Sequence, residues 1–92
     1  MADSDDLAAL LSGNNDLVGR DLRSVEMEGF NLAGRDFEKS HLEKSNFSRG
    51  ILSGSKFDQA HLSHVNFSYS DLHEIKMTQT AVTFVDFSNA IL

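Results

Sequence analysis

Residues 45–72 read SNFSRGILSGSKFDQAHLSHVNFSYSDL, and every fifth position in this stretch holds a large apolar side chain. The same spacing continues in both directions without a slip. The resulting positions, here called the repeat centres, are Leu17, Leu22, Met27, Leu32, Phe37, Leu42, Phe47, Leu52, Phe57, Leu62, Phe67, Leu72, Met77, Val82, Phe87 and Leu92. A helix repeats about every 3.6 residues and a strand every 2. A period of five fits neither, so it predicts a chain wound into regular coils.

Each repeat centre stands in a five-residue block of consistent composition. The residue two before the centre is mostly small or β-branched, the next is polar and often Asp or Asn, and polar or small residues follow. Typical blocks begin Ser45-Asn46-Phe47 and Val65-Asn66-Phe67. Over residues 14–92 this pattern resembles that of the pentapeptide-repeat family. The resemblance implies an all-β fold, a right-handed quadrilateral β-helix (solenoid) of about four coils with four blocks per coil.

The repeat centres give separate support for a coil of 20 residues. Sorted by steps of 20, they fall into columns of similar side chains, as stacking about 4.8 Å apart would favour. Two columns are aliphatic: Leu22, Leu42, Leu62, Val82 and Leu32, Leu52, Leu72, Leu92. Two are largely aromatic: Met27, Phe47, Phe67, Phe87 and Leu17, Phe37, Phe57, Met77.

Three long side chains break the block pattern near its start. Arg20, Phe30 and Arg35 occupy the position two before a repeat centre, where a small inward-facing residue is expected. Either the first coil is irregular, or these side chains turn outward and cover the N-terminal end. We therefore expect the register to be least regular before residue 36.

Residues 1–13 differ from the repeats and are expected to form a short N-terminal capping helix, ahead of the β-helix of residues 14–92. Asp3 or Ser4 suits the N-cap position, and Gly13 suits the position just after the C-cap. A helix this short needs an apolar surface to rest on. The leucines that would cover the first coil, on one face at i, i+3 and i+4, are Leu7, Leu10 and Leu11.

Composition excludes several classes of protein. Acidic residues outnumber basic ones 14 to 8, for a net charge of −6, which argues against direct nucleic-acid binding. There is no cysteine, so no disulfide framework is expected. Apolar runs are too short for a membrane span. We expect a cytoplasmic protein with no cofactor and no small-molecule substrate, although secretion without a signal remains open.

Histidines form the most suggestive surface group for a metal site. His41 and His61 lie one coil apart in the predicted columns, and two imidazoles with a nearby carboxylate could share an ion. Outward positions accept almost any residue, so these two are weak candidates and we expect no metal. Ser63, His64 and Asp58 contain the residue types of a catalytic triad, but without a nucleophile motif. We expect no enzyme.

The two ends of a solenoid need covering, because its last coil exposes apolar centres and unpaired strand edges. The sequence ends at Leu92, which is still in register as a repeat centre, so either two copies meet at this end, or a partner covers it, or the chain is part of a longer protein. We therefore expect association with a protein partner or a second copy through the C-terminal coil, as a possible homodimer. The candidate interface residues are Ile91, Leu92, Phe87, Leu72, Phe84, His64 and Tyr69.

The sequence thus favours a non-enzymatic protein–protein interaction or scaffold module, adaptor-like or effector-like. Members of the family include bacterial effectors and proteins of cyanobacteria and plastids. An alternative comes from the quinolone-resistance branch, whose acidic rods resemble B-form DNA and bind DNA gyrase or topoisomerase IV. Lys and Arg residues interrupt any acidic stripe in this chain. A surface histidine metal site is the third hypothesis.

Overall fold

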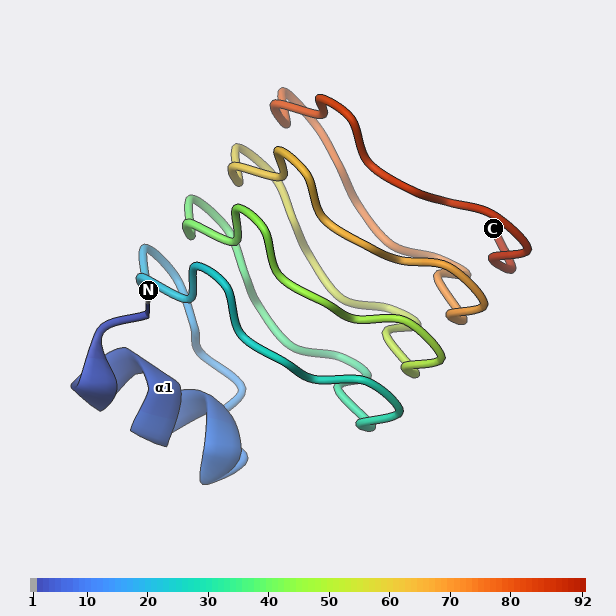
Figure 1. Cartoon of the computed structure of the whole chain (residues 1–92). Coiled ribbons are helices and arrows are strands. Elements are labelled where there is room, and N and C mark those ends of the chain that lie inside the picture. Colours follow the sequence, from blue (N-terminus) through green and yellow to red (C-terminus); the bar gives the residue numbers. More distant parts are fainter. Residues whose placement is uncertain (1) are drawn as a thin grey trace.

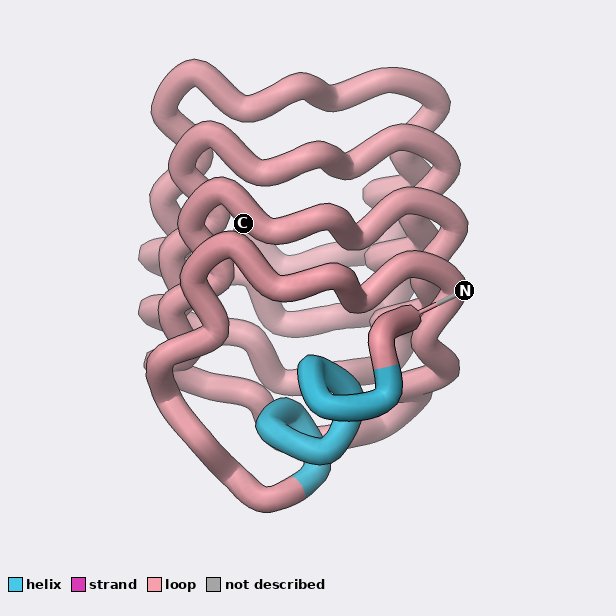
Figure 2. Tube along the Cα trace, turned by 90° about the vertical axis from the view of Figure 1, so that its left-hand side faces the viewer, coloured by secondary structure: helices cyan, strands magenta, loops and turns pink. Residues whose placement is uncertain are grey.

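The computed structural model of the chain describes residues 2–92. It contains one α-helix, α1 (Ser4–Leu11), followed by coils stacked along a common axis (Figure 1). The molecule measures 32 × 23 × 21 Å along its principal axes. Figure 2 shows that the coils carry no extended strands and that α1 lies across the end of the stack formed by the first coil.

Neighbouring coils pair through isolated parallel β-bridges. Every bridge joins residues 20 apart, the spacing predicted from the columns of repeat centres. The pairs begin with Asp16 and Asp36 and end with Asp71 and Ile91. Each side of a coil contributes a single bridged residue, because a corner turn follows within three residues. The structure is therefore a β-solenoid built from very short pairings.

Three backbone hydrogen bonds per block hold adjacent coils together, and the corner residue two after the centre makes one of them, as from the Lys44 amide to the Ser63 carbonyl at 3.0 Å. The amide of a repeat centre donates to a carbonyl 19 residues further on, as from Leu22 to His41 at 2.7 Å. The amide of the residue before the centre donates back to the previous coil, as from His41 to Arg20 at 2.8 Å. Most backbone polar groups between coils are satisfied in this way, which a buried backbone requires.

The corners are tight turns with a left-handed residue. The Ser45 amide donates to the Leu42 carbonyl at 3.1 Å across one such turn, and the intervening Lys44 has φ 64°. Gly54 occupies the equivalent position with φ 71°. Glycine adopts this conformation without steric cost, whereas other residues lose about 1–2 kcal/mol there. Most corners nevertheless carry a side chain, so the stacking of the coils overrides local preference.

The core consists of the repeat centres, which are buried from Leu17 to Leu72. Phe37 and Phe57 stack with centroids 5.0 Å apart, and Phe47 and Phe67 stack at 5.6 Å. The small inward positions are also buried, and their hydroxyls are satisfied. One example is the Ser45 Oγ, which donates to the Leu22 carbonyl at 2.9 Å. Close packing therefore extends through the interior.

The pairing is in register from Asp16 onward, so the expectation of an irregular first coil is wrong. Arg20 and Arg35 instead turn toward α1, where each finds oxygen partners. Phe30 lies exposed at the first coil. Both arginines therefore turn outward and cover the N-terminal end, which was the second possibility drawn from the sequence.

The stacked phenylalanines yield a stability prediction. Phe57→Ala should lower the free energy of unfolding by about 3–5 kcal/mol, because it removes a fully buried ring that packs on Phe37 and Phe67. Phe57→Leu, which introduces the side chain found in the aliphatic columns, should lower the free energy of unfolding by clearly less. Urea unfolding followed by circular dichroism measures both, and equal losses for the two variants would contradict the role of the ring.

Candidate protein interfaces at the two ends

The helix α1 is fixed at its start by Asp3. The Asp3 carboxylate accepts hydrogen bonds from the amides of Asp5 and Asp6 at 2.9 and 3.2 Å, as an N-cap residue does. Of the three leucines predicted to cover the first coil, Leu10 is buried and Leu7 is partly buried against the core. Leu11 instead is 57% exposed, because its side chain faces a groove beside the coil.

The end of α1 is fixed by Gly13 and by an arginine from the coil. Gly13 has φ 86°, and its amide donates to the Leu10 carbonyl at 3.3 Å. The Asn14 amide donates to the Ala9 carbonyl at 3.2 Å, which completes a Schellman motif. The Arg35 guanidinium donates to the carbonyls of Leu10 and Asn14 at 3.4 and 3.3 Å. This cation lies at the negative end of the helix dipole, where no residue of the helix's own last turn is basic.

Asp6 joins the first turn of α1 to the coil. Its carboxylate accepts the Asp21 amide at 2.8 Å and the Arg20 Nη1 at 3.0 Å. These two hydrogen bonds, the first one foremost, hold the pKa of Asp6 below its usual value. Asp21 in turn accepts two hydrogen bonds from the Arg23 side chain, both at 2.8 Å. These bonds are the largest cause that lowers the pKa of Asp21 to about 2. The sequence signalled this cluster only through the misfit of Arg20.

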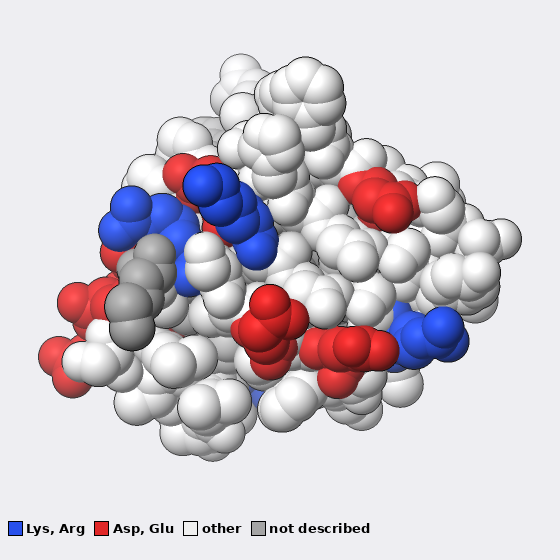
Figure 3. All heavy atoms as spheres, viewed as in Figure 1, with Lys and Arg blue, Asp and Glu red and all other residues white. Residues whose placement is uncertain are grey.

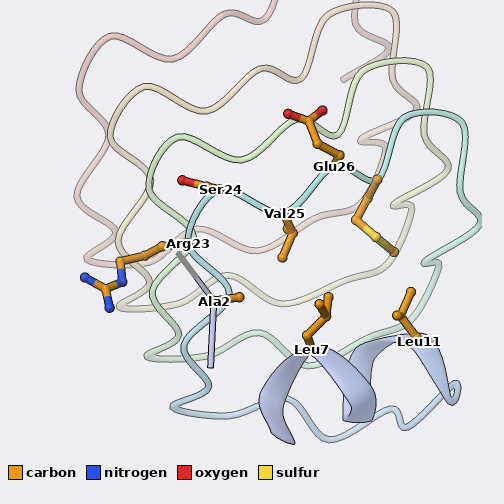
Figure 4. Close-up of a pocket in the computed structure, with 8 residues that line it drawn as sticks. Ala2, Leu7, Leu11, Arg23, Ser24, Val25 and Glu26 are labelled. Carbon is orange, nitrogen blue, oxygen red and sulfur yellow. The ribbon is translucent and has the colours of Figure 1, made fainter. Parts of the chain in front are cut away.

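An apolar groove of about 420 Å³ separates α1 from the edge of the first coil. Leu7 and Leu11 point from the helix toward the coil segment that carries Val25 (Figure 4). Arg23 and Glu26 lie on the same segment of the coil and supply polar groups. Sequence reasoning missed this groove, because it depends on which leucine of α1 is buried.

The coil of residues 73–92 presents apolar side chains to solvent. Ile91 is 61% exposed and Leu92 and Phe84 are each 79% exposed, while Phe87 is partly buried against the core. Leu72, the remaining aliphatic candidate, is only 1% exposed because this last coil covers it. Leu72 is therefore removed from the candidate surface.

The same coil has an unpaired backbone edge within residues 2–92. In the coil before it, the amides of Phe57, Leu62 and Phe67 donate to carbonyls of the last coil at 2.8, 3.0 and 2.8 Å. The equivalent amides of the last coil find no backbone acceptor in the described chain; they belong to Met77, Val82 and Phe87. Donors and apolar side chains are thus exposed together at this end.

Two aromatic pairs occupy neighbouring corner columns. The His64 and Phe84 rings stack with centroids 5.1 Å apart, and Arg49 lies 4.8 Å over the Tyr69 ring. Each pair joins successive coils. The candidate residues His64, Phe84 and Tyr69 therefore hold coils together and also offer aromatic surface beside the C-terminal end.

The geometry of His41 and His61 does not suit a shared metal ion. Their rings stack with centroids 4.3 Å apart and an interplanar angle of 3°. A ligating nitrogen binds an ion in the plane of its ring, and two parallel separated planes have no point in common. Within residues 2–92, no group of three or more His, Cys, Asp or Glu could hold a metal ion. The stack is better explained as packing between coils.

The residues with triad-like identities are engaged elsewhere. His64 stacks on Phe84, and the Asp58 carboxylate accepts the Thr78 amide at 2.7 Å. Across the described part of the chain, no hydrogen bond joins the side chains of Ser63, His64 and Asp58. The arrangement therefore offers no activated nucleophile.

Charges of both signs are interspersed on the face shown in Figure 3, where Lys and Arg lie among the Asp and Glu groups. Specific pairs of opposite charge include Arg20 with Asp6 at 3.0 Å and Arg49 with Glu28 at 3.8 Å. A continuous acidic stripe of the kind that imitates a DNA backbone is not formed on this face. The charges on this face therefore give the gyrase-binding alternative no support.

The described residues form a parallel β-solenoid with a helix over one end and, at the other, an apolar edge whose amides have no backbone partner among residues 2–92. The family model for pentapeptide repeats (8 copies) matches residues 52–80. The resemblance to the pentapeptide-repeat family is confirmed, and with it the right-handed β-helix. No curated protein matches the chain.

Solved structures of pentapeptide repeat proteins are similar to this chain. One, from the Arabidopsis thaliana thylakoid lumen, is 21% identical with a TM-score of 0.58, and the match covers 83% of this chain. This chain spans 64% of that structure's length. Another, Rfr23 from the cyanobacterium Cyanothece 51142, is 13% identical with a TM-score of 0.35, over 96% of this chain and 97% of that one. The first likeness supports the fold alone.

Within residues 2–92, no helix has the length and apolar character needed to cross a bilayer.

The contacts of Asp6 yield a prediction with a defined pH dependence. Asp6→Asn should lower the free energy of unfolding by about 1 kcal/mol more than Asp5→Asn. Both substitutions remove a carboxylate from the positive end of the helix dipole, but only the Asp6 carboxylate accepts hydrogen bonds from Arg20 and Asp21. The folded pKa of Asp6 is depressed, so its stabilisation is full above the unfolded pKa of about 3.9 and is lost as pH falls further.

Thermal and urea unfolding at pH 7 and at pH 2 measure this difference. The gap between Asp6→Asn and the unmodified chain should shrink at the lower pH. A gap that is the same at both pH values, or an equal effect of Asp5→Asn, would show that the charge of Asp6 does not anchor the helix.

Proposed function

We propose that this chain is a non-enzymatic interaction module of the pentapeptide-repeat type, and that its coil of residues 73–92 pairs with the same coil of a second copy. The observation that carries the proposal is the coincidence of exposed Ile91 and Leu92 with backbone amides that lack partners in the described chain. Leu92 is the kind of surface that a further coil covers elsewhere in this molecule, because Leu72, its equivalent one coil earlier, is only 1% exposed beneath the last coil. A second copy can supply the same kind of surface.

A two-fold axis suits this contact. Identical ends that meet about such an axis form a closed dimer, in which each apolar group of one copy faces the corresponding surface of the other. Burial of Ile91, Leu92 and the exposed part of Phe87 favours association by about 25 cal/mol per Å² of apolar surface. Edge amides gain carbonyl or side-chain partners at the same time. The dimer would present two sets of solenoid faces to other proteins, as an adaptor does.

The filled interior supports a binding role over catalysis. The inward side chains from Leu17 to Leu72 pack closely, so contact with other molecules takes place on the outer faces and at the ends. We further propose a cytoplasmic location, which the lack of cysteine favours.

The test compares two isoleucines in the same column. Ile91→Glu should raise the dimer dissociation constant at least about tenfold, because it removes an apolar contact and places like charges near each other across the axis. Ile51→Glu, a matched change 40 residues earlier on the side of the solenoid, should leave it unchanged. Sedimentation equilibrium measures both, with circular dichroism as the control for folding.

Two results would overturn the proposal. The first is an unmodified chain of residues 1–92 that stays monomeric at the highest attainable concentration. The second is equal weakening by Ile91→Glu and Ile51→Glu, which would place the contact on the side of the solenoid.

A further inference from the structure

The N-terminal edge of the first coil is only partly covered by the chain itself. At Asp21 the edge is satisfied, because its amide donates to the Asp6 carboxylate at 2.8 Å and its carbonyl accepts the Asp3 amide at 3.1 Å. One block further on, the amide and carbonyl of Glu26 have no hydrogen-bond partner among residues 2–92. The Asp3 amide at the Asp21 carbonyl shows that this edge accepts a backbone donor.

The equivalent residue in the next coil shows what Glu26 lacks. The Asn46 amide donates to the Val25 carbonyl at 2.9 Å, and its carbonyl accepts the Met27 amide at 2.8 Å. Any occupant that satisfies Glu26 in the same way must offer one carbonyl and one amide at strand spacing. An extended peptide backbone has this chemistry.

The apolar groove lies directly beside this open edge. Val25, next to Glu26, lines one side, and Leu7 and Leu11 of α1 line the other (Figure 4). Met27, which follows Glu26, also lines the groove. In an extended peptide alternate side chains point the same way. A peptide paired with Glu26 therefore sends an apolar side chain into the groove. A strand edge next to a helix, with an apolar groove between them, is a geometry suited to strand addition.

The negative charge at the N-terminal end favours a peptide with basic residues. Residues 1–35, which include the Arg35 that contacts α1, hold seven of the 14 acidic residues and three of the eight basic ones, so they carry −4 of the total net charge of −6. Glu26 itself is exposed at the rim of the groove. Basic side chains on either side of the apolar residue would complement this field and speed encounter.

We propose that the groove between α1 and residues 23–27 binds an extended peptide segment of another protein, in which basic residues flank β-branched apolar residues. The peptide adds as a strand at Glu26 and inserts an apolar side chain between Leu11 and Val25. This surface lies at the opposite end from the coil of residues 73–92, and the proposal is independent of self-association through that coil.

The probe is the fluorescein-labelled peptide Lys-Lys-Val-Thr-Val-Lys-Lys, titrated with the full chain and followed by anisotropy. Leu11→Lys should raise its dissociation constant at least about tenfold, because the variant places a charge in the apolar groove and repels the basic probe. Val18→Lys adds the same charge at another exposed apolar residue, outside the groove, and should change binding by less than about twofold.

Peptide variants separate strand addition from simple charge attraction. One probe carries N-methyl groups on both valines, and another carries them on the second, fourth and sixth residues. A strand presents alternate amides to opposite edges, so one of the two should lose binding and the other should keep it. A peptide with Glu in place of every Lys should bind at least about tenfold more weakly. Equal binding by all probes would overturn the proposal.

Amide spectra of the isotopically labelled chain locate the contact directly. The Glu26 amide and its neighbours in residues 23–27 should shift on addition of the unmodified peptide. Shifts confined to residues 73–92, or no shifts at millimolar peptide, would also overturn the proposal. Either pattern would leave self-association through the C-terminal coil untouched, because that is measured without peptide.

Discussion

The structure depends on a hydrogen bond between residues 19 apart, from the amide of each repeat centre to the coil that follows. From Leu17 to Leu72 every repeat centre makes this bond, at 2.7–3.0 Å. The bond fixes the length of a coil, and a fixed length brings residues 20 apart into register. Stacked phenylalanines, inward serines and left-handed corners all follow from that register. A single inserted residue would break this register for the pairs of residues that it separates, because their spacing would become 21 residues.

A ladder of this kind has two unlike ends. At the first coil the missing partners are supplied in part by Asp3 and Asp6, and α1 covers the apolar centres through Leu10. At the last coil the described chain supplies none. The two proposed binding surfaces are therefore consequences of the same ladder. At residues 23–27 the edge of the first coil is only partly covered by α1, and at residues 73–92 the edge is open and carries apolar side chains.

Much of this could be predicted from sequence, because the repeat is a local rule applied many times. The columns of repeat centres predicted the stacking of Phe37 on Phe57, and the cap residues Asp3 and Gly13 predicted both ends of α1. The groove could not be predicted. Neighbouring residues in a helix point about 100° apart, so the rotation of α1 decides that Leu10 is buried and Leu11 lines the groove. Arg20 and Arg35 were visible only as misfits, since their partners come from another element.

The dependence of each coil on its neighbours has a consequence for how the molecule opens. Stability in such arrays is close to a sum over nearest-neighbour contacts, and unfolding begins where a unit has only one neighbour. In a single copy, the first coil is held between α1 and the coil after it, whereas residues 73–92 contact a coil on one side alone within the described residues. Amide hydrogen exchange should therefore form a gradient along the axis. Unfolding of a single copy starts at Leu92 and advances one coil at a time toward the helix.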